Sequence, residues 1–488
     1  MVKVNNLKSS YIVVFLIAGA LYVATCAPGP LWQDSGMYQY RIWHNDIEGR
    51  LGLALSHPLY HIIGIGVKQI PLGEFAHRIN LISAVAAAFT IANLFLLMRI
   101  WLDKLLPAVI TAAALALSHT FWRHAVIAET YTLYTALFSA ELLMLLQYFK
   151  KRRVGYLYLL GLCNGLAAAN HMFAIIAFAC YLVFCIILLK RKHIKLRNFR
   201  NIVLMWIIGA APYGFLIVKD IIQGSSFTAT AASAFFGNKW QGNVLNASLS
   251  GGLIKENLIL IAYNFPTPNI ILFFAGIYGL TKVPRGFGFA KVLVALLILY
   301  FIFAYRYTVP DRYAFFIPFY CLVSVLIGVG FDLLITAFKY KVLCWIVVIF
   351  ALLPIPIYIA VPFIAEKLEF NLSTRADVPY RNDYTWFLRP WKVGYRGAER
   401  FAEEVFEKLE PEAVVYADNT MVYPLLYMQQ VKGKKRANVK IISEYASSED
   451  VPLLSEKSIE QWLSEGDVYA VSPVAGRKGT GIFWKIAD

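Results

Sequence analysis

Long apolar runs recur along this chain, separated by short polar stretches. A run of about twenty apolar residues is long enough to cross the hydrocarbon core of a membrane as a helix. The pattern therefore predicts an α-helical polytopic membrane protein with about eleven spans. We expect these spans near residues 10–26, 78–99, 105–121, 131–149, 155–170, 172–189, 202–220, 257–281, 289–305, 313–335 and 341–363.

The charges between the apolar runs predict the orientation. Every second connection is basic, whereas the others are mixed in sign, and basic connections face the cytoplasm. The N-terminus is therefore expected in the cytoplasm, and the tail after Phe363 outside the cytoplasm. The inner connections contain Arg99, Lys104, 150–153, 190–192, Lys195, Arg197, Arg200, Lys282, Arg285, Lys291, Lys339 and Lys341.

The first apolar run admits two interpretations. Lys3 and Lys8 precede it, and Thr25-Cys26-Ala27 weakly resembles a signal-peptidase site. We expect an uncleaved span, because cleavage would leave the following spans without their packing partner.

Composition supports a membrane protein and argues against a disulfide framework. Of the 488 residues, 59% are hydrophobic and 16% are charged, whereas about a quarter are charged in soluble domains. The net charge of +16 follows from the inner connections, so no nucleic-acid partner is predicted. The six cysteines lie in or beside apolar segments and show no zinc-type spacing.

The first outer loop, residues 27–77, is long for a connector. Met37, Tyr40, His44, Ile47 and Leu51 recur at helical spacing, which predicts a surface helix. Residues 58–70 are apolar but too short to span, so they predict an interfacial or re-entrant helix. A lone carboxylate, that of Asp34, precedes this pair at the membrane surface.

Unusual polar residues gather on the predicted outer side, while the inner connections are basic and otherwise plain. A functional site on the outer face, at the membrane surface, is therefore expected. The outer residues are Asp34, His57, His61, His119, His124, Glu129, His171, Asp311 and Arg312.

After residue 363 the pattern changes, which predicts three parts. Residues 1–363 would form the transmembrane domain, and 364–395 an interfacial linker that mixes basic and aromatic residues. Residues 396–488 would form a small extracytoplasmic α/β domain. Its expected helices are 399–409 and 421–430, and its expected strands are 413–417, 439–442 and 468–471.

Several outer motifs resemble the GT-C superfamily of membrane glycosyltransferases. They are most similar to the branch that contains protein O-mannosyltransferases of the transmembrane-protein-260 type. The resemblance covers roughly residues 30–320, with one departure: Met37 stands where the family usually has an acidic residue. The motifs are Asp34-Ser-Gly36, His57-Pro58, 78–83, Phe121-Trp122, Glu129-Thr-Tyr131, Asn170-His171 and Asp311-Arg312.

This resemblance implies a hexosyltransferase that acts on the extracytoplasmic face. The expected donor is a polyprenyl-phosphate-linked sugar, mannose or another hexose. The expected acceptor is a hydroxyl of a protein serine or threonine, or of a cell-envelope glycan. The resemblance also implies that the first-loop aspartate, Asp34, is the general base.

The residue chemistry agrees with such a reaction. Transfer to a hydroxyl needs a base for the acceptor proton and cations for the departing phosphate. Asp34 is the expected base and Glu129 the second candidate catalytic residue. The expected substrate-binding residues are His57, Arg123, His124, His171 and Arg312.

Each candidate also has a simpler structural interpretation. Asp34 could be a helix cap, Glu129 could be solvated or paired with an arginine, and Arg312 could pair with Asp311. His57 could be a surface residue before a Pro-initiated helix, and His171 a hydrogen-bonded turn residue. No cofactor is required by the expected chemistry. Asp34, His57 and Glu129 have the ligand types for a divalent metal, but their spacing does not predict one.

Two other functions remain open. A transporter or lipid-carrier flippase would place polar groups near the bilayer midplane, often in broken helices. The motif at residues 264–268, Asn-Phe-Pro-Thr-Pro, could break the eighth expected span. A non-catalytic scaffold that binds an acceptor for another enzyme is the third possibility.

Overall fold

A computed structural model describes most of the chain. The described residues are 4–237, 242, 246, 251–282, 287–309, 311–338, 341–372, 378–433, 439–443, 461–462, 467–473 and 482–486. The following structural statements refer to these residues.

Helices form the larger part of the molecule, and each of the eleven apolar runs lies on one or two of them. Six helices are long and apolar enough to cross a membrane, or as many as nine spans if each of three bent pairs counts as one. The expected number of about eleven stays a prediction. The helices are α1 (Val4–Ala24), α4 (Phe75–Leu102), α5 (Leu105–Ala116), α7 (Tyr131–Lys151), α8 (Gly155–Asn170), α9 (Ala174–Lys190), α10 (Leu196–Ile222), α13 (Gly251–Asn264), α14 (Ile271–Gly279), α15 (Phe287–Arg306), α16 (Ile317–Phe338), α17 (Lys341–Leu352) and α18 (Pro354–Lys367).

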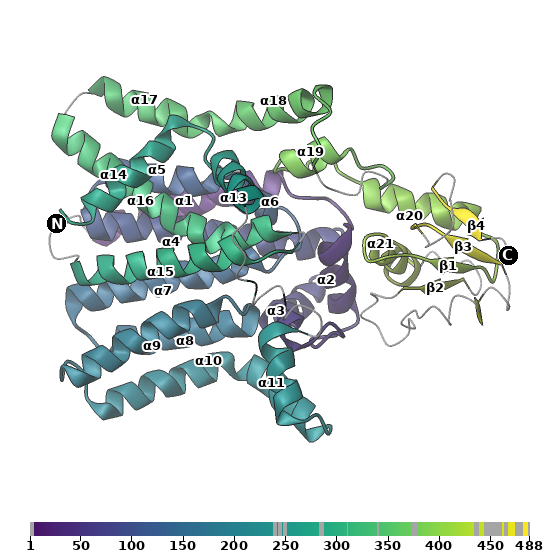
Figure 1. Ribbon diagram of the computed structural model, residues 1–488, viewed down its shortest axis with the longest axis horizontal. Coiled ribbons are helices and arrows are strands. Elements are labelled where there is room, and N and C mark those ends of the chain that lie inside the picture. Colours follow the sequence, from purple (N-terminus) through teal and green to yellow (C-terminus); the bar gives the residue numbers. More distant parts are fainter. Residues whose placement is uncertain are drawn as a thin grey trace.

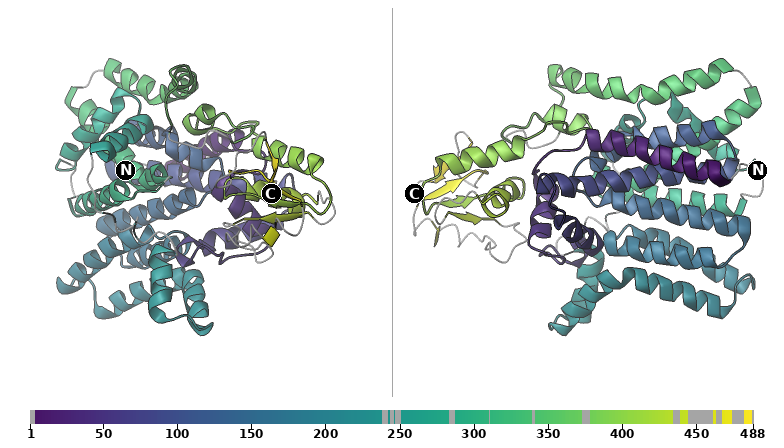
Figure 2. Two further views of the ribbon diagram at one scale, coloured as in Figure 1. Left: turned by 45° about the vertical axis from the view of Figure 1, so that its right-hand side comes forward. Right: turned by 180° about the vertical axis from the view of Figure 1, so that it is seen from behind.

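The long helices lie side by side, with the N-terminus at one end of the bundle and the C-terminal tail beyond the other (Figures 1 and 2). The helices α8 and α9 contain 16 and 17 residues, or about 25 Å of helix. They are separate helices, since residues 171–173 interrupt them.

The N-terminus and the tail lie at opposite ends of the bundle (Figure 1), as the loop charges predict. Which end faces the cytoplasm stays a prediction.

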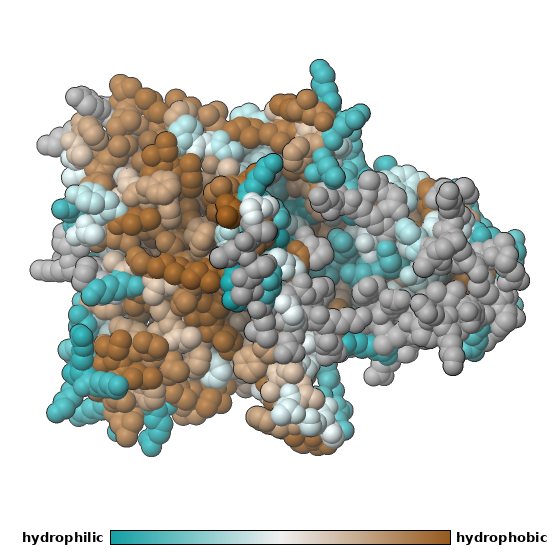
Figure 3. Space-filling model, in the orientation of Figure 1, coloured by the Kyte–Doolittle hydropathy of each residue, from teal (hydrophilic) through white to brown (hydrophobic). Residues whose placement is uncertain are grey.

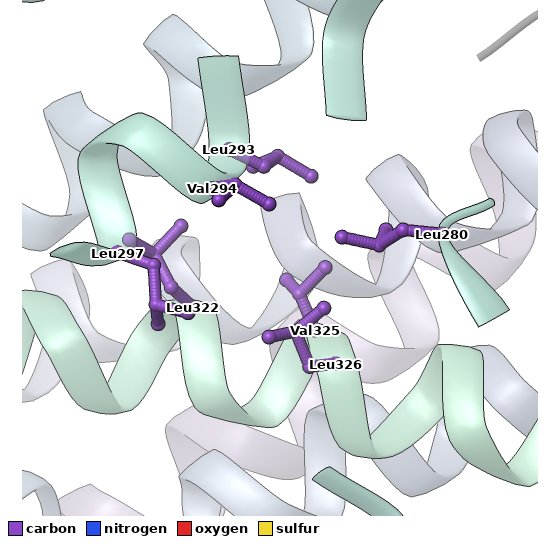
Figure 4. A pocket seen from close by; sticks show the side chains of 7 residues that line it. All are labelled: Leu280, Leu293, Val294, Leu297, Leu322, Val325 and Leu326. Atoms are coloured by element: carbon purple, nitrogen blue, oxygen red, sulfur yellow. The ribbon is translucent and has the colours of Figure 1, made fainter. Parts of the chain in front are cut away.

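Apolar side chains cover the visible face of the bundle, whereas hydrophilic residues lie at its end and at its junction with the tail (Figure 3). Inside, α14, α15 and α16 enclose a small apolar cavity (Figure 4). Its lining has no polar side chain, so it is a packing gap and not a candidate site. It is lined by Leu280, Leu293, Val294, Leu297, Leu322, Val325 and Leu326.

The expected break in the eighth span is present. The helices α13 and α14 meet at an angle of 110°, and a short 3₁₀ helix, η2 (Pro268–Ile270), lies between them. Neighbouring helices satisfy the polar groups at this bend. Asn264 accepts a hydrogen bond from the backbone of Thr120, and Asn269 donates one to the carbonyl of Val347. The bend is therefore built into the packing of the bundle.

The first outer loop forms two helices, α2 (Gln33–Trp43) and α3 (Pro58–Lys68). The predicted helix at 58–70 is confirmed, but the predicted surface helix through Leu51 is wrong in extent and exposure. It ends at Trp43 because Asp46 accepts hydrogen bonds from the backbone of Glu48 and Gly49 and forms a turn. Most of α2 is buried, because the tail packs on it.

Short helices connect the spans, and they carry several of the candidate residues. They are η1 (Leu53–Leu55), α6 (His119–Ala125), α11 (Phe227–Phe236) and η3 (Arg312–Phe316). The α5–α6 pair bends by 71°, so α6 turns away from the direction of its span.

The tail contains a four-stranded sheet in the order β2-β1-β3-β4. The strand β1 pairs in parallel with β2 and β3, and β4 is antiparallel. The predicted helices and strands are present, and β4 is an addition to them. The elements are α19 (Asp383–Leu388), α20 (Gly397–Lys408), β1 (Val414–Tyr416), α21 (Val422–Leu426), the π-helical turn η4 (Tyr427–Val431), β2 (Lys440–Ile442), β3 (Val468–Ala470) and β4 (Trp484–Ile486).

Apolar contacts join the tail to the bundle. Phe401 of α20 packs on Trp32, and Tyr423 of α21 on Tyr40 of α2. Both contacts belong to one hydrophobic core that continues into the spans. The domain boundaries at 363 and 396 therefore stay predictions.

The contact between α8 and α10 depends on glycine, and this dependence can be tested. A methyl group at Gly209 would lie 2.7 Å from the backbone nitrogen of Leu166, whereas one at Gly214 would meet nothing within 4 Å. We expect Gly209→Ala to destabilise the protein by about 1–3 kcal/mol through overpacking. Gly214→Ala, on the same helix, should leave the melting temperature in detergent unchanged or raise it slightly. Equal melting temperatures would contradict this packing.

Candidate functional site

Asp34 lies in the first turn of α2, and a buried hydrogen-bond network fixes that turn. Asn80 of α4 donates to the carbonyls of Ala27 (3.0 Å) and Gly29 (3.2 Å) and accepts from Gln39 of α2 (2.9 Å). Gln39 in turn accepts from the backbone nitrogen of Leu31 (3.2 Å). The irregular chain before α2 is therefore bound to a long membrane helix.

The carboxyl group of Asp34 has no hydrogen-bond or ion-pair partner among the described residues. Trp32 occupies the N-cap position and makes no side-chain cap, so Asp34 does not cap α2. Asp34 keeps partial exposure, although protein atoms crowd around it. Burial, together with the negative charge of Asp311, raises the pKa of Asp34 to about 7. Asp34 is thus an accessible carboxyl group that titrates near neutral pH.

Two further carboxyl groups lie near Asp34. Glu129 comes from the loop between α6 and α7, and Asp311 directly precedes η3. Burial and the charges of Asp34 and Asp311 raise the pKa of Glu129 well above its ordinary value. Burial also raises the pKa of Asp311. A hydrogen bond from Tyr131 lowers this pKa, but the effect of burial is larger. Three outer loops therefore bring three carboxyl groups into one electrostatic group.

The sequence interpretation missed the role of Asp311 in this group. The simpler interpretation of Arg312 was a pair with its neighbour Asp311, but Arg312 binds other residues. Its guanidinium donates to Glu256 (2.7 Å), to Asn257 (2.6 Å) and to the carbonyl of Tyr305 (3.1 Å). Arg312 thus joins α13 to the end of α15. Its predicted contact with the donor phosphate stays a prediction.

Ser83 of α4 fixes the backbone at Glu129. Its hydroxyl donates to the carbonyl of Glu129 (2.9 Å) and accepts from the Glu129 amide (3.0 Å). Asn170 donates to the next carbonyl, that of Thr130 (3.0 Å). Glu129 is therefore positioned by two buried side chains from different helices.

His57 has an unusual backbone conformation, with φ 49° and ψ 50° at the N-cap of α3. A left-handed conformation is uncommon outside glycine and is often retained at functional sites. Its Nδ1 lies 2.7 Å from the carbonyl of Asn170. A carbonyl only accepts, so Nδ1 carries the hydrogen and Nε2 has the lone pair. Burial lowers the pKa of His57 to about 4, so the ring is neutral at pH 7.

His171 packs against His57, with ring centres 5.1 Å apart in a stacked arrangement. Its Nδ1 accepts a hydrogen bond from the backbone of Phe173 (3.2 Å), so the neutral ring carries its hydrogen on Nε2. Burial and the neighbouring His57 lower the pKa of His171 well below its usual range. Tyr131 also contacts His171, with ring centres 5.3 Å apart. The structure therefore brings the two candidate histidines together beside the Glu129 loop.

Arg123 and His124 lie on α6, next to the linker. Arg123 donates to the carbonyl of Trp386 (2.5 Å), and its guanidinium lies over the ring of Phe387 (4.9 Å). His124 contacts the rings of Tyr131 (5.0 Å) and Tyr313 (5.7 Å). Arg123 is also 5.7 Å from the ring of Tyr313. The charges of Asp311, Glu129 and Asp34 also act on Tyr313. Tyr313 is therefore close both to Arg123 and His124 and to the carboxyl groups.

Asp34, His57 and Glu129 have the ligand types for a divalent metal ion. Over the part of the chain that the structure describes, no three His, Cys, Asp or Glu side chains form a group that could hold one.

Comparison with known proteins identifies a related family. Residues 55–195, less than a third of the chain, match the model of the protein O-mannosyl-transferase TMEM260 N-terminal domain. This segment contains five of the seven candidate residues and excludes Asp34 and Arg312. No curated protein sequence matches the chain.

The fold resembles those of solved membrane glycosyltransferases. ArnT from Cupriavidus metallidurans bound to undecaprenyl phosphate aligns with a TM-score of 0.60 and 16% identity, over 96% of this chain and 93% of that one. Its apo state aligns with a TM-score of 0.59 and 14% identity, over 95% and 93%. An Archaeoglobus fulgidus oligosaccharyltransferase tethered to an acceptor peptide aligns with a TM-score of 0.50 and 14% identity, over 95% and 69%.

At these identities the structural matches show the fold alone. Together with the family model they confirm the predicted resemblance: the fold of this chain is GT-C-like, and its long apolar helices support an integral membrane protein.

The contact between Ser83 and Glu129 can be tested by stability. Ser83→Ala leaves a buried amide and a buried carbonyl of Glu129 without their partner, which costs about 1–3 kcal/mol for each group. Ser324→Ala is a matched control, because that buried hydroxyl donates only to the carbonyl of Cys321 in its own helix. We expect a clearly lower melting temperature in detergent for Ser83→Ala than for Ser324→Ala. Equal values would contradict the positioning role of Ser83.

Proposed function

We propose that this protein transfers a sugar, mannose or another hexose, from a polyprenyl-phosphate-linked donor to a hydroxyl acceptor. The reaction takes place at the extracytoplasmic surface of the membrane, with the N-terminus in the cytoplasm and the tail outside. Asp34 acts as the general base. The proposal rests on one observation above others: Asp34 is a partly accessible carboxyl group with no partner among the described residues, and its pKa is about 7.

The chemistry follows from that observation. The acceptor hydroxyl attacks the anomeric carbon of the sugar, and its proton passes to the carboxylate of Asp34. The bond between the sugar and the phosphate breaks, and the lipid phosphate leaves with the bonding electrons. A base is most effective when its pKa is near the working pH. An aspartate at its ordinary value near 3.9 would be a weaker base.

Glu129 has a different role from Asp34 in this proposal. Its pKa lies well above the ordinary value, because it is buried beside two other carboxyl groups. Burial beside these groups favours its protonated form, which would donate a hydrogen bond to a substrate oxygen instead of taking a proton. A neutral acid held this way can orient a substrate in a buried site.

The neighbouring residues suit a sugar phosphate. His57 offers a lone pair at Nε2 and His171 a hydrogen at Nε2, so together they can bind sugar hydroxyls. Arg123 lies on the side of Tyr313 where a phosphate would be held. The Nδ1 of the neutral His124 ring faces the carbonyl of Thr120, so His124 would bind a protonated oxygen there through the lone pair at Nε2. Arg312 keeps its proposed phosphate contact through the edge of its guanidinium, whose Nε has no hydrogen-bond partner.

The comparisons support the classes of donor and acceptor. The structural neighbour ArnT is bound to undecaprenyl phosphate, and the matched family model is that of a protein O-mannosyl-transferase. We therefore propose protein serine and threonine hydroxyls as acceptors, with a cell-envelope glycan as the alternative that the assay should include. The lipid phosphate is itself the leaving group, so the proposal includes no organic cofactor.

The experiment that tests the function measures transfer of radiolabelled sugar from polyprenyl-phosphate donors in purified membranes. Asp34→Asn keeps the shape of the side chain and removes the base, so we expect a loss of about 10²-fold or more. Asp332→Asn is the control, because Asp332 binds Lys104 near the other end of the bundle. Transfer that survives in Asp34→Asn would remove Asp34 as the base.

An inactive wild type would test the function as a whole. If no donor supports transfer and the protein instead moves a lipid carrier across liposomes, the transporter function replaces the transferase.

The pH dependence gives a second prediction. The base form of Asp34 predominates above its pKa of about 7 and declines below it, so transfer should fall as the pH decreases through 7. Asp311→Asn removes a negative charge that raises this pKa, so the acidic limb of the profile should move to lower pH. The measurement is kcat/KM for the acceptor between about pH 5 and 9, a range that lies on both sides of the pKa of Asp34. An acidic limb that Asp311→Asn leaves in place would contradict the coupling.

A further inference from the structure

Two buried cations share one carbonyl oxygen at the junction of α6 and the linker. Arg123 Nη1 donates to the carbonyl of Trp386 at 2.5 Å, and Lys392 Nζ donates to the same oxygen at 2.9 Å. The side chains are nearly inaccessible, with 4% and 3% of the surface of Arg123 and Lys392 exposed. Because both nitrogens lie on one oxygen, the two positive charges are only a few ångströms apart.

Neither cation forms an ion pair with any described carboxylate. The other hydrogen bond of the Lys392 ammonium is to the carbonyl of Arg389 (2.7 Å). Arg123 Nε is buried and has no hydrogen-bond partner among the described residues. Arg389 adds a third positive charge nearby. Burial, followed by the charges of Arg123 and Arg389, holds the pKa of Lys392 well below its usual range, so its positive charge is destabilised unless an anion lies beside it.

Buried charges are normally paired, because desolvation is costly. Aromatic rings give part of the compensation here: the ammonium of Lys392 lies 4.9 Å from the centre of the Trp386 ring. The carbonyl of Thr25, at the end of α1, accepts from the backbone of Lys392 and not from its ammonium. The described part of the chain thus supplies no anion to Arg123 and Lys392.

The location of the pair relates it to the carboxyl groups. Arg123 lies 5.7 Å from the centre of the Tyr313 ring, and the same tyrosine is affected by the charges of Asp311, Glu129 and Asp34. Arg123, which shares a carbonyl with Lys392, and the three carboxyl groups are therefore within electrostatic range of one side chain. A sugar phosphate placed beside Tyr313 could have its phosphate on the cations and its anomeric carbon toward Asp34.

We propose that Lys392 and Arg123 together bind the phosphate group of the lipid-linked donor, and of the polyprenyl phosphate that remains after transfer. This inference rests on the proposed function and adds a residue of the linker to the donor site. The phosphate takes the place of the missing anion, and Arg123 can offer it the unpartnered Nε–H. The linker is then part of the binding site as well as a connection to the tail.

The test is equilibrium binding of a radiolabelled polyprenyl phosphate to the purified full chain in detergent, with the uncharged polyprenol of the same length as reference. Wild type should prefer the phosphate. Lys392→Met and Lys392→Gln remove the charge and should weaken binding of the phosphate by about tenfold or more, without changing binding of the polyprenol. Lys392→Arg should keep the preference.

Two controls separate the possible results. Lys367→Gln removes an exposed positive charge at the end of α18 and should have little effect on either ligand. Thermal unfolding shows whether each variant is folded. If either Lys392→Met or Lys392→Gln does not fold, the other one is compared with wild type.

Each outcome supports or overturns a specific claim. If wild type prefers the phosphate and the folded neutral variants prefer it equally, Lys392 only fastens the linker to α6, and this inference fails while the proposed function stands. If wild type itself shows no preference for phosphate over polyprenol, the proposed donor class fails as well.

Discussion

The hydrogen bonds of Asn80 are the constraint on which the position of Asp34 depends. The chain between α1 and α2 is irregular and buried, so its carbonyl groups need donors inside the protein. Asn80 supplies two of them, and its own oxygen is satisfied by Gln39, which holds Leu31 in turn. Apolar packing has no direction and could not select one position for this turn. A directional network that leaves no group unsatisfied can do so, because each alternative position would expose an unpaired buried group.

The tail completes this constraint from the opposite side of α2. Trp32 donates to the hydroxyl of Tyr395 (2.5 Å), and Tyr40 donates to Gln430 (3.0 Å). Tyr427 donates to Glu74 (2.5 Å), next to the start of α4. Figure 1 shows α2 between the long helices and the tail. The helix that carries Asp34 is thus held by both parts of the chain, which explains why it is buried although it belongs to an outer loop.

Local pattern was sufficient to predict the helices and to select several polar residues that the structure brings close together. The spans follow from the length of apolar runs, and Asp34 and Glu129 are conspicuous because carboxylates are scarce in such a chain. The extent of α2 could not be predicted, since the turn at Asp46 and the cover by the tail depend on contacts distant in sequence. Helical spacing at His44 and Leu51 indicated amphipathicity but did not show where the helix ends.

Contacts between distant segments account for the residues that the sequence did not reveal. Asp311 and Arg312 are adjacent, and adjacency suggested a pair, but Arg312 is directed to Glu256 and Asn257 on α13. Lys392 resembled the other basic residues of an interfacial linker. Only the fold places it on the carbonyl that Arg123 also binds, although more than 250 residues separate Arg123 from that carbonyl.

The separation of opposite charges across Tyr313 is what makes the site suitable for group transfer. If Arg123 were paired directly with Glu129, the two charges would neutralise each other and neither would be available to a substrate. The aromatic rings of Trp386 and Phe387 hold the guanidinium on the linker side instead. On the other side, the negative charge of Asp311 makes protonation of Asp34 more favourable. The carboxyl group thus gains a proton as the reaction proceeds, while the cations stabilise the charge that develops on the departing phosphate.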